Sequence, residues 1–77
     1  MTTIYIVHRI KGKTNKIYDI YNTLHNARSS ALMGEQTNDG YSYVVYEYVY
    51  EDYKPLRFRK HSLVGNEPSD WQSIRYA

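Results

Sequence analysis

Residues 41–50 have the sequence Tyr-Ser-Tyr-Val-Val-Tyr-Glu-Tyr-Val-Tyr, and this stretch decides the fold. Aromatic and β-branched residues favour strands, and successive side chains of a strand point to opposite faces of its sheet. The two faces of this segment are Tyr43, Val45, Glu47 and Val49 on one side and Val44, Tyr46, Tyr48 and Tyr50 on the other. Because both faces carry large side chains, the pattern predicts a central strand.

Two strands are predicted upstream of this segment. Residues 3–10 alternate along the chain, and residues 16–21 are again β-branched and aromatic, which is typical of strands. Residues 12–15, Gly-Lys-Thr-Asn, have turn chemistry, because Gly and Asn tolerate a positive φ. We therefore expect an antiparallel hairpin with a loop of these four residues.

A single helix is predicted between the hairpin and the central strand, over residues 23–33. Asn22 or Thr23 can cap its first turn, because a side-chain oxygen there accepts a free backbone N–H. Gly34 suits its end. The apolar stripe of the helix is narrow and consists of Leu24, Ala27 and Ala31. Such small side chains allow a helix to lie close against a sheet.

The C-terminal third predicts a fourth strand and a short helical turn. Residues 51–55 end in a proline that breaks the central strand, and residues 56–64 form the next strand. Residues 69–75 begin with Ser-Asp-Trp-Gln, a capping-box pattern that predicts a helical turn. The fold class is therefore α+β: a small, mainly antiparallel sheet with one helix on one face (ββαββ), in a single domain over residues 1–77.

Composition limits the possible functions. The chain has 77 residues, no cysteine and a net charge of +2. A domain of this size is near the stability margin and has little room for a deep active site. It shows no apolar run long enough to span a membrane and no basic lead of a signal peptide, so we expect a cytoplasmic protein.

An enzyme or a metal protein is not expected. A four-residue loop places Ile10 opposite Ile17 and His8 opposite Asp19, and this His–Asp pair is the only acid–base pair that the register brings together. No nucleophile or phosphate-binding loop accompanies it, so we interpret it as a structural ion pair. The three histidines have no ligand spacing and cysteine is missing, so we expect no metal and no cofactor.

The tyrosines predict a binding surface. The chain has ten Tyr, and Tyr46, Tyr48 and Tyr50 form a stripe on one face of the central strand. A lone helix covers one face of a small sheet, so the other face displays tyrosines, which are common at protein interfaces. Trp71 is either an anchor for the same partner or a lid over the core. The leading hypothesis is a non-catalytic protein-binding module in which the Tyr stripe supplies contact area and Arg57 and Arg59 supply specificity.

Two alternatives remain open. Arg57, Arg59 and His61 project from one face of the fourth strand, and together with the Tyr stripe they could bind nucleic acid, although the net charge of +2 is small for that function. The third hypothesis is a homodimer formed through an exposed strand edge.

The pattern also resembles a group of known proteins. Residues 5–10 (Tyr-Ile-Val-His-Arg-Ile) and, after a polar turn, residues 16–27 (Lys-Ile-Tyr-Asp-Ile-Tyr-Asn-Thr-Leu-His-Asn-Ala) precede a Tyr/Glu-rich strand. Over residues 3–50 this arrangement resembles small early proteins encoded by tailed bacteriophages. The resemblance implies a protein that docks on a bacterial host protein and inhibits or redirects it. It carries over no site residues, because that group shares no site motif.

Overall fold

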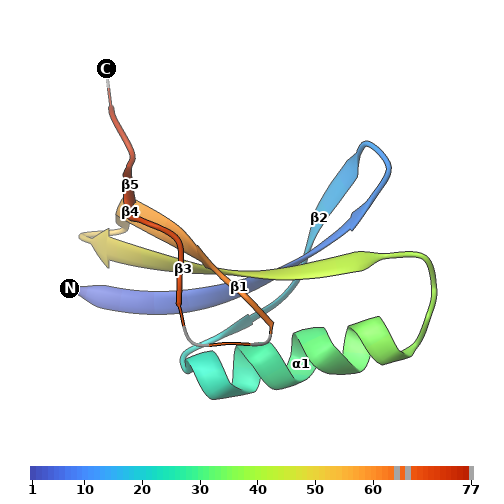
Figure 1. Ribbon diagram of the computed structural model, residues 1–77. Helices are drawn as coiled ribbons and strands as arrows, with labels where there is room; N and C mark the ends of the chain where they lie inside the picture. Colours follow the sequence, from blue (N-terminus) through green and yellow to red (C-terminus); the bar gives the residue numbers. More distant parts are fainter. Residues whose placement is uncertain (64, 66, 77) are drawn as a thin grey trace.

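The fold is α+β, with one antiparallel sheet and one helix (Figure 1). The computed structural model describes residues 1–63, 65 and 67–76. The elements are β1 (Thr2–Lys11), β2 (Thr14–Tyr21), α1 (Leu24–Gln36), β3 (Ser42–Glu51), β4 (Lys54–His61) and β5 (Gln72–Ser73). The strand order across the sheet is β2-β1-β3-β4-β5. β3 is the central strand, as its two apolar faces predict, and the ββαββ order of the main elements is confirmed.

The β1–β2 hairpin differs from the predicted register. Its loop is only Gly12 and Lys13, because Lys11 already pairs with Thr14. A β-bulge then shifts the register, so that His8 lies opposite Ile17 whereas Val7 lies opposite Asp19. The predicted His8–Asp19 pair is therefore wrong, and Nδ1 of His8 lies 2.8 Å from Oδ1 of Asn15 instead. Gly12 has a φ of 58°, which lets the chain turn within two residues.

Helix α1 begins at the predicted cap and packs through its small residues. The Thr23 side chain accepts a hydrogen bond from the backbone N–H of Asn26 at 3.3 Å. The buried helix residues, Ala27, Ala31 and Gly34, face a core that includes Val7, Tyr43 and Val45.

Gly34 does not end the helix, which continues to Gln36 and is capped by Thr37. This glycine instead permits close packing, because a Cβ at Gly34 would lie 2.5 Å from the Tyr43 ring. The position therefore requires glycine for space rather than for its backbone freedom.

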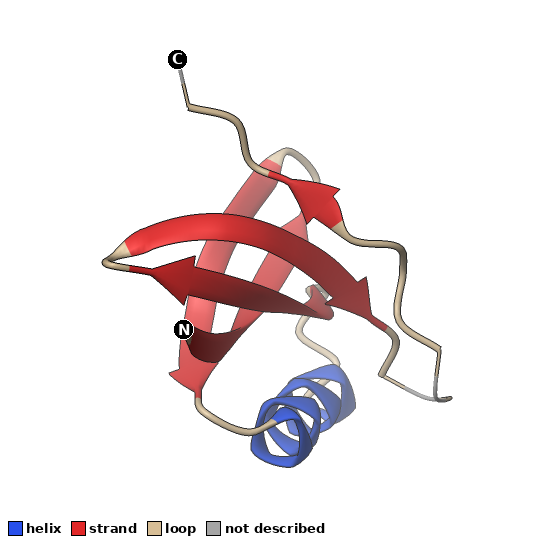
Figure 2. Ribbon diagram, turned by 90° about the vertical axis from the view of Figure 1, so that its left-hand side faces the viewer, coloured by secondary structure: helices blue, strands red, loops and turns tan. Residues whose placement is uncertain are grey.

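The helix covers only one face of the sheet (Figure 2). It packs against β1, β2 and β3, and the opposite face carries no helix. No helix within the described residues has the length and hydrophobicity needed to cross a membrane.

The C-terminal segment is an edge strand rather than a helical turn. The structure does not confirm the turn over residues 69–75; instead, β5 pairs with β4. The Ser69 hydroxyl accepts the N–H of Lys60 at 2.8 Å, and the N–H of Ser69 donates to the carbonyl of Lys60 at 2.9 Å. Ser69 thus binds the edge of β4 instead of capping a helix. β4 itself starts at Lys54, includes Pro55 and ends at His61, and residue 64 of the predicted strand lies outside the described residues.

Candidate functional site

The candidate site is the sheet face that lies opposite α1, which we call the open face. Directly paired residues of antiparallel strands lie on the same face, so the register defines this surface. Its large side chains are Ile4, Ile6 and His8 of β1; Ile17 and Ile20 of β2; Val44, Tyr46, Tyr48 and Tyr50 of β3; and Phe58 and Lys60 of β4.

An aromatic row runs along β3 on the open face. The Tyr46 and Tyr48 ring centroids are 6.3 Å apart, as are those of Tyr48 and Tyr50. The Phe58 ring stacks on Tyr48 with a centroid distance of 5.3 Å and an interplanar angle of 23°, and His8 contacts the edge of Tyr46 at 4.9 Å. These neighbours restrict each ring, so the row offers contact area that is already ordered.

The three tyrosines of the row remain accessible. Each is half-buried, and no helix lies over them. Burial and the nearby Tyr46 and Tyr50 raise the pKa of Tyr48, so its hydroxyl stays protonated in neutral solution. The structure thus places the predicted stripe on the uncovered face, with phenol groups that can donate and accept hydrogen bonds.

Two isoleucines extend this surface, and the sequence interpretation missed them. Ile17 and Ile20 of the edge strand β2 are 59% and 51% exposed, and their respective partners His8 and Ile6 place them on the open face. The signal was present in β2, but the assumed four-residue loop gave the wrong neighbours. An apolar surface that continues from the aromatic row onto an edge strand is typical of an interaction site.

Arg57, Arg59 and Trp71 lie on the other face of the sheet. Arg57 and Arg59 pair with Val49 and Glu47, which face the helix side. The two guanidinium carbons lie 4.4 and 4.2 Å from the centroid of the half-buried Trp71 ring. The structure therefore joins these three predicted residues into one cluster and separates that cluster from the tyrosine row.

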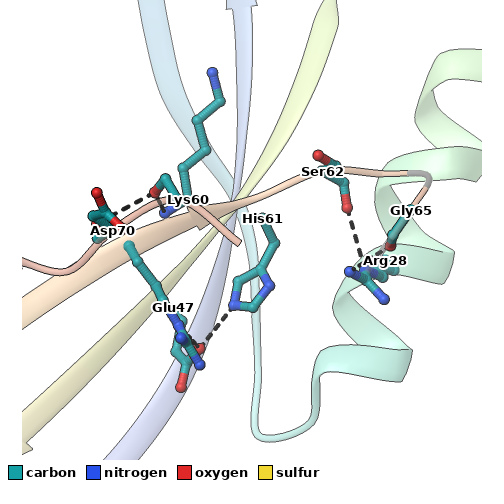
Figure 3. A network of polar contacts seen from close by, with 9 residues as sticks. Arg28, Glu47, Lys60, His61, Ser62, Gly65 and Asp70 are labelled. Carbon is teal, nitrogen blue, oxygen red and sulfur yellow. Dashed lines mark hydrogen bonds and ion pairs between the residues drawn. The ribbon is translucent and has the colours of Figure 1, made fainter. Parts of the chain in front are cut away.

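His61, which the sequence assigns to the binding surface, is buried. It is 4% exposed, and its Nε2 lies 2.7 Å from Oε1 of Glu47 (Figure 3). The same carboxylate oxygen accepts a hydrogen bond from Nε of Arg59 at 2.8 Å. Burial alone would raise the pKa of Glu47, but the hydrogen bonds from Arg59 and His61 and their charges outweigh it, so this pKa is lowered. These bonds from Glu47 to Arg59 and His61 link β3 to β4 on the helix side of the sheet.

A second polar contact fixes the segment that follows β4. Arg28 of α1 donates from Nε to the carbonyl of Ser62 at 3.2 Å and from Nη2 to the carbonyl of Gly65 at 3.1 Å (Figure 3). The helix and the end of β4 are thus held together on the face opposite the candidate site.

The described residues contain no cluster of three or more His, Asp or Glu side chains that could hold a metal ion. The chain matches no family model, no curated protein and no solved structure. Its function therefore has to be inferred from its own geometry. The open face carries exposed apolar side chains that no other described element of the chain covers.

Proposed function

We propose that this protein is a non-catalytic binding module that docks on another protein through its open face. The observation that carries this proposal is that the Tyr46–Tyr48–Tyr50 row and the exposed Ile17 and Ile20 lie on the same uncovered face of the sheet. Ordered aromatic rings beside exposed aliphatic side chains are typical of the centre of protein interfaces. The resemblance to phage early proteins makes a bacterial host protein the proposed partner, which the module would inhibit or redirect.

The distribution of positive charge supports a protein partner over nucleic acid. The open face carries only Lys60 and His8 among the basic side chains that the sheet register assigns to it. Arg9 lies over the Tyr41 ring, and Arg57 and Arg59 lie over Trp71, all on the helix side. A nucleic-acid site needs cations beside its stacking rings, and here the sheet separates the two.

A pair of matched double variants tests the proposal. Ile17→Lys with Ile20→Lys changes two exposed residues of the open face, whereas Leu32→Lys with Met33→Lys changes two exposed residues of α1. Both variants add the same charge, and circular dichroism should show that both stay folded. Tagged protein incubated with bacterial lysate should retain its partner in the helix variant and release it in the open-face variant. Equal capture by both variants would contradict docking on the open face.

Further measurements on the same variants separate the two alternatives, nucleic-acid binding and self-association. Nucleic acid is indicated if nuclease releases the captured material and if affinity falls steeply with salt. Self-association is indicated if sedimentation of the pure protein shows a dimer that the open-face variant lacks. The edge of β2 is a poor site for strand pairing, because it carries Lys16, Asp19 and a β-bulge, features that oppose edge-to-edge contact.

A further inference from the structure

A groove lies at one end of the open face, where the β3–β4 turn passes the start of β1. Its volume is about 430 Å³, and its lining consists of Thr2, Ile4, Tyr50, Asp52 and Tyr53. In Figure 1 this turn is close to the N-terminus and away from the helix. A space of this size admits a long side chain, and it continues directly from the last tyrosine of the aromatic row.

The turn beside the groove breaks a local rule of backbone conformation. Asp52 and Tyr53 connect the paired residues Glu51 and Lys54, with φ values of 50° and 67°. Two central residues with positive φ form a type I′ turn, for which Asn-Gly is the usual sequence. Asp tolerates this region, but a bulky tyrosine does so only rarely. Tyr53 is also 99% exposed, so its ring gains no burial in return. Departures of this kind occur mainly at functional sites.

The groove combines the groups that bind an organic cation. The faces of Tyr50 and Tyr53 attract a cation through their ring electrons, and the Asp52 carboxylate provides the opposite charge. Both ion pairs of the described residues involve Glu47, so none of them neutralises Asp52. Lys54, the nearest basic residue along the chain, places its Nζ 5.8 Å from the centroid of the Tyr76 ring.

We infer that this groove binds the cationic side chain of a lysine or arginine that a protein partner presents at this end of the open face. The source of the cation rests on the proposed function, whereas the chemistry of the groove does not. The partner would place its aliphatic stem along Ile4 and its charged group between Tyr50, Tyr53 and Asp52. The charged group would then fix the direction in which the partner lies on the aromatic row.

Nuclear magnetic resonance titration of the isolated protein tests the site without the partner. The probes are N-acetyl-lysine methylamide and N-acetyl-arginine methylamide, and N-acetyl-norleucine methylamide is the uncharged control. The two cations should shift the amide signals of Ile4, Asp52 and Tyr53 with Kd values of about 1–10 mM, since a single contact of this kind is weak. Norleucine should bind about fivefold more weakly, because it lacks the charge.

Four variants distinguish the contribution of each group. Asp52→Asn and Tyr53→Leu should each weaken cation binding about two- to fivefold, whereas Tyr53→Phe, which keeps the ring, should preserve it. Asp70→Asn removes an exposed carboxylate elsewhere and should change nothing. Equal binding of norleucine and lysine, or unchanged affinity in both weakening variants, would overturn the inference. The titration tests only the groove and lysate capture tests only the open face. A negative result in one experiment therefore leaves the result of the other unchanged.

Discussion

Replacing Gly34 by alanine tests the closest contact between the helix and the sheet. A Cβ at this position would lie 2.5 Å from Cε2 and Cζ of Tyr43. The Tyr43 ring has little freedom to move, because it is 6% exposed, contacts the edge of Tyr18 at 5.2 Å and donates a hydrogen bond to Asp39 at 3.2 Å. To regain ordinary contact, the ring must shift by roughly 1 Å.

The size of the effect follows from three opposing contributions. Alanine in place of glycine within a helix stabilises the protein by about 1 kcal/mol. Overpacking a buried site costs about 1–3 kcal/mol, and displacing Tyr43 weakens a hydrogen bond worth about 0.5–1.5 kcal/mol. The sum is a net destabilisation of about 2 kcal/mol, or a Tm lower by about 10 °C for a domain of this size.

Urea and thermal unfolding followed by circular dichroism measure this change. The control is Gly34→Ala in a Tyr43→Leu background, where the aromatic ring is absent and the alanine should stabilise the helix by up to about 1 kcal/mol. A second control is Gly12→Ala, which has open space around it and only the strain of a positive φ. If Gly34→Ala alone is as stable as the parent protein, the close packing argument is refuted.

Three further predictions concern charge, strain and the C-terminal strand. The pKa of Glu47 is lowered in the folded protein, so the stability that this carboxylate contributes is complete above pH 4.5, its ordinary pKa, and is lost as the pH falls below that value. The free energy of unfolding of Glu47→Gln should therefore fall less at acid pH than that of the parent protein. Tyr53→Gly should raise the free energy of unfolding by about 1 kcal/mol, because glycine accepts a positive φ without strain, and a loss of stability in urea would count against it. Ser69→Ala should speed hydrogen exchange of the Lys60 amide and shift Trp71 emission to longer wavelength, whereas unchanged spectra would show that Ser69 does not hold β5.

The periodicity of the sequence predicted β1 to β4, the helix, and the common face of the three tyrosines of the row. Alternation along β1 and β3 identifies strands without tertiary information, because the side-chain period of a strand is two residues. The small residues Ala27 and Ala31 identified the helix face. That a helix of 13 residues covers only one side of the sheet follows from geometry, but the sequence left open which side it covers, and the structure supplies that answer for Tyr46 and Tyr48.

Register and edge pairing were not predictable from the same pattern. Gly12 and Asn15 favour turns, so the local pattern assigns residues 12–15 to a loop and displaces β2 by two residues along β1. This displacement keeps Ile17 on the correct face but gives it Ile10 instead of His8 as its partner. The bulge between Ile17 and Asp19 adds a shift of one residue, which reverses the face and moves Ile20 to the open face.

The C-terminal error has a different cause. Residues 69–72 fit the capping box, which is a local signal worth about 1 kcal/mol. Pairing with β4 provides more stabilising contacts than the capping box does. They are the backbone hydrogen bonds from Ser69 and Ile74, the hydrogen bond accepted by the Ser69 hydroxyl, and the contacts of the Trp71 ring with two arginines. Tertiary contacts of this kind override a local preference and cannot be found from the segment alone.

Under the proposed docking, two opposite charges on the open face would let a chain of small net charge discriminate between classes of partner. Along the open face, Asp52 lies beyond Tyr50 at one end and Lys60 lies beside Tyr46 toward the other. Tyr46 and Tyr50 are four residues apart, or about 13 Å along the strand, which exceeds the screening length of about 8 Å at physiological salt. The two charges therefore act separately, each on the part of a partner that lies over it. A polyanion would be attracted at one end and repelled at the other, whereas a protein surface with a cation and an anion at matching positions would be favoured at both. If the proposed docking is right, this polarity would select a partner by its charge pattern. Lys60→Glu and Asp52→Lys should then each weaken capture, and the double exchange, which leaves the net charge as it was, should not restore it.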